Sequence, residues 1–247
     1  MGLSTDLIMS GSGLPKMHEA VWTDLGVVDY EKSMELQSAL RADVAEGGPG
    51  RLLFLEHPHT ITLGYSLKGD EGRSAIRSKP EALEKEGIKV VQVDRGGKAT
   101  YHGPGQLVCY TVLSLKEMKL GVKRYVGKIE SVVLSALKEL GVDADLDPSY
   151  PGVWTGGAKV AAVGIRVSDR VSTHGFAINL DPDLAKFGHI VPCGIADKPV
   201  TSLARVMDEV PDWNKLVDLL VGHLKDEMRL VLNRVGPDDV WSVMDGG

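Results

Sequence analysis

Residues 122–141 read VKRYVGKIESVVLSALKELG, and this stretch is the clearest structural signal in the chain. Its apolar residues return every three or four positions, so they form one face of an α-helix, and Gly141 stands where such a helix stops. The segment 152–180 that follows is rich in strand-forming residues. Within it, Gly156-Gly157 is a hairpin-turn signal. A long amphipathic helix followed by a β-hairpin predicts a fold that mixes the two kinds of element.

The rest of the chain supports this mixture. A second amphipathic helix follows Pro211-Asp212, with an apolar face from Trp213 to Val231, and a third follows Asp29. The remaining signals predict strands at 51–56, 60–63 and 89–94, a polar loop at 69–77, and a helix from Pro80 to Gly87. Helices and strands do not alternate regularly, which favours an α+β fold with a mixed, largely antiparallel sheet flanked by helices. We expect one domain at 21–247 behind a flexible N-terminal tail at 1–20.

Length and charge exclude several classes of protein. The 247 residues carry 28 Lys and Arg against 34 Asp and Glu, a net charge of −6, so nucleic acid is not expected as a partner. The longest apolar runs fall far short of the roughly 20 residues that span a membrane. The N-terminus shows neither a signal peptide nor an Arg-rich transit peptide. These features predict a cytoplasmic protein that does not associate with membranes.

The chain has only two cysteines, which argues against a disulfide scaffold and excludes a C-x-x-C motif. Cys109 lies in the apolar run LVCY and is expected to be a buried strand residue. Cys193 lies between Pro192 and Gly194 in a predicted loop. A lone cysteine is usually inert, but one that is exposed beside a basic residue can act as a nucleophile.

Glycine is frequent (29 residues) and clusters in the stretch RGGKATYHGPGQ at 95–106. This stretch is predicted to be a loop between two strands, and it matches neither a P-loop nor a dinucleotide-binding motif. Its glycines would let the backbone approach a ligand closely, although a glycine-rich hairpin without a role is also consistent with the pattern. Lys159 stands at the start of a small, apolar strand, either as a solvated strand end or as a base drawn into a site.

The histidines allow two interpretations each. His57 and His59 flank Pro58 as a metal pair would, but no carboxylate or cysteine completes the set, so we expect a structural loop and no metal. His102 and His174 are candidates for positioning other groups, and they are equally consistent with hydrogen-bonded structural residues.

Three sequence blocks resemble the lipoyl(octanoyl) transferase family of lipoate biosynthesis. They are RGGKATYHGPGQL at 95–107, KVAAVGI at 159–165 with STHGFAINL at 172–180, and IVPCGI at 190–195 followed by VTSL at 200–203. The separation of 34 residues between Lys159 and Cys193 also agrees. The resemblance spans the chain from about Trp22 to Leu203, and the order of the blocks makes it specific.

The resemblance implies a fold similar to the catalytic domain of lipoate–protein and biotin–protein ligases. It also implies transfer of an octanoyl group from octanoyl-acyl carrier protein to a lysine of lipoyl domains, in 2-oxoacid dehydrogenases and the glycine-cleavage H protein. Cys193 would carry the acyl group as a thioester, and Lys159 would move protons. Substrate binding would fall to Arg95, Gly96, Gly97, Lys98, Ala99, Thr100, Tyr101, His102, Ala162, Val163, Gly164, Gly175, Phe176 and Ala177, with His174 and Gly194 as supporting residues.

The same resemblance implies a monomer without a cofactor of its own, since the donor brings its phosphopantetheine. Two alternatives stay open. The first is an ATP-dependent lipoate or biotin ligase on the same fold, against which the loop HGPGQ differs in spacing from the glycine-rich loop of ligases. The second is a non-catalytic protein that binds lipoyl domains, against which both Lys159 and Cys193 are present.

Overall fold

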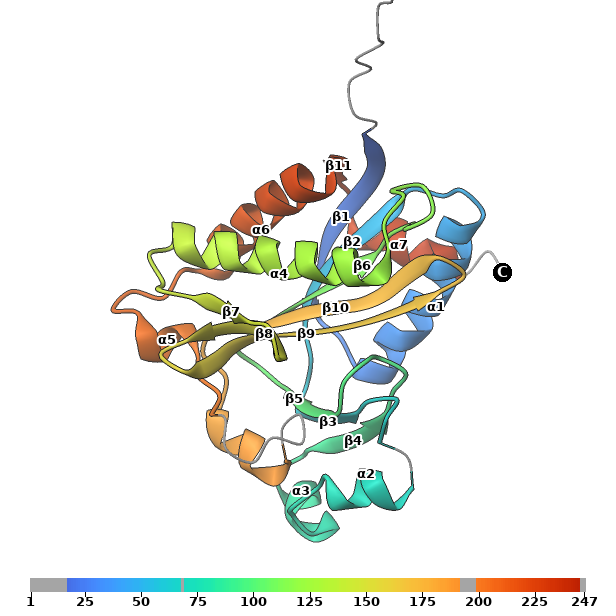
Figure 1. Ribbon diagram of the computed structural model, residues 1–247. Coiled ribbons are helices and arrows are strands. Elements are labelled where there is room, and N and C mark those ends of the chain that lie inside the picture. The colour runs from blue at the N-terminus through green and yellow to red at the C-terminus, as the bar shows by residue number, and fades with distance from the viewer. Residues whose placement is uncertain (1–16, 68, 192–198, 245–247) are drawn as a thin grey trace, which may run out of the picture.

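A large mixed sheet forms the centre of the computed structural model, which describes residues 17–67, 69–191 and 199–244 (Figure 1). Within this part of the chain the sheet has eight strands in the order β11-β1-β2-β6-β10-β9-β8-β7. The pairs β11–β1 and β1–β2 are parallel, and the pairs from β2 to β7 are antiparallel. Its strands are β1 (His18–Val27), β2 (Gly50–Glu56), β6 (Gln106–Val112), β7 (Asp145–Asp147), β8 (Tyr150–Thr155), β9 (Ala158–Ser168), β10 (Val171–Asn179) and β11 (Leu230–Arg234).

A second, three-stranded sheet has the order β4-β3-β5. It is made of β3 (Thr60–Leu63), β4 (Lys89–Gln92) and β5 (Ala99–His102). Figure 1 shows it beside α2 (Asp70–Ser74) and α3 (Pro80–Lys85), at one end of the large sheet. The other helical elements of the described residues are α1 (Tyr30–Ala45), α4 (Val122–Glu139), η1 (Leu184–His189), α5 (Leu203–Val206), α6 (Trp213–Met228), α7 (Pro237–Trp241) and η3 (Ser242–Met244).

Helices cover both faces of the large sheet, because its central strands alternate apolar side chains between two cores. Leu52 and Phe54 of β2 belong to the core that contains α4 and α6. Leu53 and Leu55 of the same strand belong to the core that contains α1. The helix α4 is fixed further by the buried hydroxyl of Tyr125, which donates to Thr111 Oγ1 at 2.7 Å. The predicted α+β class with flanking helices is therefore confirmed.

Several predicted elements are present with their expected boundaries. The α1 helix starts after Asp29, whose carboxylate accepts from the Glu31 amide at 3.0 Å as an N-cap. The α4 helix ends before Gly141, which has a φ of +83°. The hairpin of β8 and β9 turns at Gly156 and Gly157, whose φ values are +55° and +77°.

Other predictions about secondary structure were wrong. The polar loop at 69–77 contains α2, which is too short to show a helical period. The glycine-rich stretch 95–106 is only partly a loop, because β5 lies within it and pairs with β3. The α6 helix does not reach Val231, which lies in β11 and is 44% exposed, because Arg229 adopts a left-handed φ of +55° and ends the helix. Strand β1 begins at His18, inside the stretch assigned to the tail.

Candidate active site

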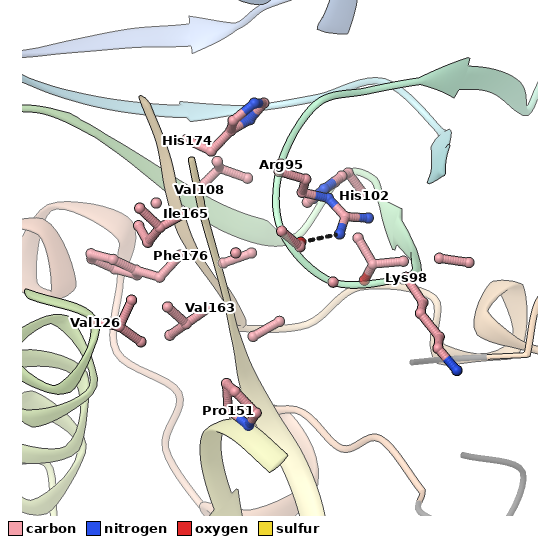
Figure 2. A pocket seen from close by; sticks show the side chains of 18 of the residues that line it. Arg95, Lys98, His102, Val108, Val126, Pro151, Val163, Ile165, His174 and Phe176 are labelled. Atoms are coloured by element: carbon pink, nitrogen blue, oxygen red, sulfur yellow. Dashed lines mark hydrogen bonds between the residues drawn. The ribbon is translucent and has the colours of Figure 1, made fainter. Parts of the chain in front are cut away.

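A cavity of about 510 Å³ lies between the large sheet, α4 and the segment 95–102 (Figure 2). The residues that line it come from most layers of the fold. They are Tyr30 of α1, Ser66, residues 95–100 and His102, Val108 and Tyr110 of β6, Val126 of α4, residues 149–151, Lys159 and residues 162–165 of β9, and residues 174–177 of β10. Every residue that the sequence predicted to bind substrate lines this cavity except Tyr101.

Tyr101 points away from the cavity because side chains alternate along β5. Its ring is fully buried in the core of the small sheet and packs edge-on against Phe187. Its hydroxyl is hydrogen bonded to His59 Nδ1 at 2.7 Å. Tyr101 thus stabilises the small sheet, and its neighbours Thr100 and His102 face the cavity.

The loop 95–98 is held by backbone contacts on both sides. The Gly64 amide donates to the Lys98 carbonyl (3.1 Å), and the Gly96 amide donates to the Ile165 carbonyl of β9 (3.2 Å). The buried Arg95 guanidinium donates to Thr62 Oγ1 from Nη2 at 2.6 Å and to the Gly96 carbonyl at 3.0 Å. Arg95 therefore faces the cavity as a fixed cation, whereas the Lys98 side chain extends away from the other labelled side chains (Figure 2).

Two glycines lie opposite each other where β9 and β10 pass the cavity. Gly164 pairs with Gly175 in the antiparallel register. A Cβ atom on Gly175 would lie 2.0 Å from the Cys109 carbonyl oxygen, and one on Gly164 would lie 3.3 Å from Arg95 Cδ. These positions must stay without side chains for the strands and Arg95 to approach so closely.

Apolar side chains and uncharged polar groups form the rest of the wall. Figure 2 places Val126, Val163 and Phe176 together on one side of the cavity. Near α1, burial raises the pKa of the Tyr30 and Tyr110 hydroxyls. Burial likewise holds the pKa of His102 well below its ordinary value. These groups are therefore neutral at pH 7, which suits an uncharged, apolar ligand.

His174 is placed by contacts that the sequence did not reveal. Its φ is +58°, unusual for a residue with a side chain, and its amide donates to Gln37 Oε1 at 2.7 Å. Its Nε2 is hydrogen bonded to Asp94 Oδ1 at 2.7 Å, and this bond lowers the pKa of Asp94. Asp94 also pairs with Arg166 at 3.1 Å. Asp94 and Gln37 thus hold His174 in place, and no sequence motif marks them.

Lys159, near the start of β9, lines the cavity and is partly exposed. Its Nζ donates to the Pro151 carbonyl at 2.8 Å and lies 4.8 Å from the centre of the Trp154 ring. The neighbouring chain is held against its backbone, because the Lys159 amide donates to the Pro199 carbonyl at 2.9 Å. Lys159 is therefore a partly exposed residue of the cavity wall, and its role as a base stays a prediction.

Cys193 and Gly194 lie outside the described residues. Backbone hydrogen bonds hold the described chain on either side of them. The Val191 amide donates to the Ala75 carbonyl at 2.9 Å, and the Thr201 amide donates to the Lys159 carbonyl at 2.9 Å.

Cys109, in contrast, is fully buried in β6, and burial raises the pKa of its thiol well above the ordinary value. A thiol in that position is unreactive, as expected from the sequence.

His57 and His59 do not point to one site. His57 is fully buried and hydrogen bonded at both nitrogens, to the Val28 carbonyl and to Tyr110 Oη, each at 2.7 Å. His59 bonds Tyr101 instead. Each ring is thus hydrogen bonded within the protein, as the structural interpretation expects. Across residues 17–67, 69–191 and 199–244, no group of three His, Cys, Asp or Glu side chains could hold a metal ion, and no helix is long and apolar enough to cross a membrane.

Solved structures define the class of fold. Lipoate-protein ligase A bound with ATP superimposes with a TM-score of 0.76 at 17% identity, covering 92% of this chain and 93% of that one. Biotin protein ligase from Aquifex aeolicus in complex with biotin and ATP reaches a TM-score of 0.50 at 15% identity, covering 85% and 70%. The predicted likeness to the fold of these ligases is confirmed.

The family follows from sequence. A family model described as the lipoyl protein ligase A/B catalytic domain matches residues 29–225. The octanoyltransferase of Syntrophobacter fumaroxidans is 41% identical over 210 residues, which are 85% of this chain and 90% of that protein. This chain belongs to the lipoyl protein ligase A/B catalytic domain family.

Proposed function

We propose that this protein is an octanoyltransferase that moves an octanoyl group from acyl carrier protein to a lysine of lipoyl domains. The observation that carries the proposal is the combination of a 41% identical octanoyltransferase with an apolar cavity that Lys159 helps to line. A cavity of about 510 Å³ falls within the range of roughly 300–1,000 Å³ typical of small-ligand sites.

The wall of this cavity fits a saturated acyl tail. This part of the wall consists of valine and phenylalanine side chains, the paired Gly164 and Gly175, and the neutral hydroxyls of buried tyrosines. None of these groups needs a charged partner in the ligand. Each methylene buried there contributes about 0.8 kcal/mol. Arg95 lines the cavity as a polar group that could face the acyl carbonyl and the pantetheine arm.

The first half-reaction uses Cys193. Its thiolate attacks the thioester carbonyl of the donor, the bond between that carbonyl and the pantetheine sulfur breaks, and the pantetheine thiol leaves with a proton. A thioester is already activated, so the step needs neither ATP nor a resident cofactor. A cysteine thiol near its ordinary pKa of about 8.5 is mostly protonated at pH 7, so a nearby cation assists by favouring the thiolate. Lys159 supplies that cation.

The second half-reaction uses the acceptor. The lipoyl-domain lysine attacks the octanoyl thioester on Cys193, an amide bond forms, and the cysteine thiol is released. The attacking amine must lose a proton, and Lys159 takes it in its neutral form. Cys193 and Lys159 therefore share protons as a coupled pair over the full cycle. The acceptors are lipoyl domains of 2-oxoacid dehydrogenases and the glycine-cleavage H protein, and the enzyme works as a monomer.

The two cysteines provide the test. Incubation with octanoyl-acyl carrier protein should give an octanoyl adduct on the intact protein, seen by mass spectrometry. Cys193→Ala should lose both the adduct and transfer to a lipoyl domain, whereas Cys109→Ala should keep both. Full transfer by Cys193→Ala would refute the mechanism. Pyrophosphate release that depends on octanoate and ATP would identify a ligase instead, and lipoyl-domain binding without turnover would identify a non-catalytic protein.

A further inference from the structure

The peptide unit that joins Pro151 to Gly152 is hydrogen bonded at both ends. Its carbonyl oxygen accepts from Lys159 Nζ at 2.8 Å. Its amide nitrogen donates to Glu130 Oε1, also at 2.8 Å. One rigid, planar group therefore links the carboxylate of Glu130 to the ammonium of Lys159.

Glu130 comes from a firmly held element. It lies in α4, four residues after Val126, which lines the cavity. The same helix is anchored in the core by the fully buried Tyr125 and Ile129. Because residues four apart share a helix face, α4 directs Val126 to the cavity and Glu130 to the start of β8. The position of the Glu130 carboxylate is thus fixed by the core and not by a surface loop.

Gly152 allows this arrangement because it has no side chain. Its φ is +124°, and a Cβ atom there would lie 2.4 Å from the Ala161 carbonyl oxygen and 3.3 Å from Lys159 Cε. The Lys159 side chain therefore passes directly over Gly152 to reach the Pro151 carbonyl. With such close packing, the orientation of this single peptide decides where the ammonium lies.

We propose that Glu130 is a positioning residue for Lys159 that acts through the Pro151–Gly152 peptide. A carboxylate that accepts from the amide of a peptide polarises it, so the carbonyl at its other end becomes a stronger acceptor for an ammonium. Glu130 itself touches neither substrate nor cysteine in this scheme. The inference rests on the proposed role of Lys159 in acyl transfer.

Two substitutions test the hydrogen bond. Glu130→Ala removes the acceptor and should lower kcat for octanoyl transfer about tenfold, the effect of losing one hydrogen bond to a charged group. KM for octanoyl-acyl carrier protein should stay within about twofold, because the cavity wall is unchanged. Glu130→Gln keeps an oxygen that can accept from Gly152 and should remain within about threefold of the wild-type kcat. Glu139→Ala is the matched control, because Glu139 lies on the same helix but pairs with His223. It should change neither kcat nor KM.

A chemical readout separates this inference from the proposed function. Limited acetylation followed by peptide mass spectrometry reports the accessibility of individual lysines without any turnover. Lys159 should react severalfold faster in Glu130→Ala than in wild type or Glu130→Gln. Lys128, which pairs with Glu227 at 2.7 Å, serves as the internal reference.

Each outcome has one meaning. If kcat and Lys159 acetylation are both unchanged in Glu130→Ala, the inference is overturned. Octanoyl transfer by the wild-type protein would still support the proposed function. Equal loss in Glu130→Ala and Glu130→Gln, with a raised KM and a lower melting temperature, would assign Glu130 a general structural role and also overturn it. An inactive wild-type protein would refute the proposed function, and the acetylation comparison would still decide the hydrogen bond.

Discussion

His57 shows how burial changes the behaviour of a single residue. Its ring is fully buried, and both nitrogens are hydrogen bonded. Burial disfavours the imidazolium and lowers the pKa of His57 from 6.5 to about 4. The sequence favoured a structural loop over a metal pair with His59, and the two rings indeed have different hydrogen-bond partners. The consequence of the burial is a dependence of stability on pH.

We expect the free energy of unfolding to fall as the pH drops from about 6.5 to about 4. In this window the unfolded chain binds a proton at His57 and the native state does not, so acid favours unfolding. The full effect of His57 approaches about 3 kcal/mol, at about 1.4 kcal/mol per pKa unit. Urea unfolding at pH 7.5, 5.5 and 4.5 measures it.

His57→Gln is the control for this prediction because glutamine cannot titrate. The variant should be less stable than wild type at pH 7.5, and the difference should shrink as the pH falls. A constant difference across the three pH values would show that His57 does not contribute to the acid sensitivity.

At the scale of elements, glycines mark where strands must approach closely. Gly175→Ala would place a Cβ atom 2.0 Å from the Cys109 carbonyl oxygen, between β10 and β6. Because a strand in the middle of the sheet cannot move aside, we expect a loss of about 1–3 kcal/mol of stability. Thermal or urea unfolding of the purified variant is the measurement.

Gly127→Ala is the matched substitution within α4. Nothing lies within 4 Å of the position of its Cβ, and alanine favours a helix over glycine. We expect this variant to gain up to about 1 kcal/mol. If Gly175→Ala and Gly127→Ala changed stability in the same direction, local packing around the new Cβ atom would not explain the change in either variant.

At the scale of the whole molecule, the loop 95–98 joins the two sheets and closes the cavity between them. It is bonded to the end of β3 through Gly64 and to β9 through Ile165. A Cβ atom on Gly64 would lie 2.2 Å from the Gly97 carbonyl oxygen. A substitution in the small sheet therefore moves a wall of the site in the large one.

Gly64→Ala should displace this loop and weaken substrate binding. We expect KM for octanoyl-acyl carrier protein to rise by about tenfold or more, since small displacements of positioning groups have large kinetic effects. Steady-state transfer assays measure the change. Gly188→Ala, with nothing within 4 Å of its Cβ, should leave KM unchanged. An unaltered KM in Gly64→Ala would mean that the loop is not a wall of the substrate site.

The sequence predicted the elements whose information is local. The period of α4, the Asp29 cap and the Gly156-Gly157 turn are each encoded within a few residues, so they could be read directly. Three features could not be predicted in this way. The α2 helix is too short to show a helical period, β5 depends on strand pairing, and α6 ends at Arg229, a left-handed residue that is not glycine. The motif residues predicted to bind substrate all line the cavity apart from Tyr101.

By itself, the sequence of this protein determined its fold class, the family blocks and the candidate pair Lys159 and Cys193. Only the tertiary structure brought Tyr30, Tyr110 and Val126 to the cavity and joined His174 to Asp94. It also bonded Glu130 and Lys159 to opposite ends of one peptide group. The physical reason is distance along the chain. Periodicity and turn chemistry act over a few neighbouring residues. A cavity wall, or a peptide bonded to both a carboxylate and an ammonium, forms only when helices and strands far apart in sequence pack together.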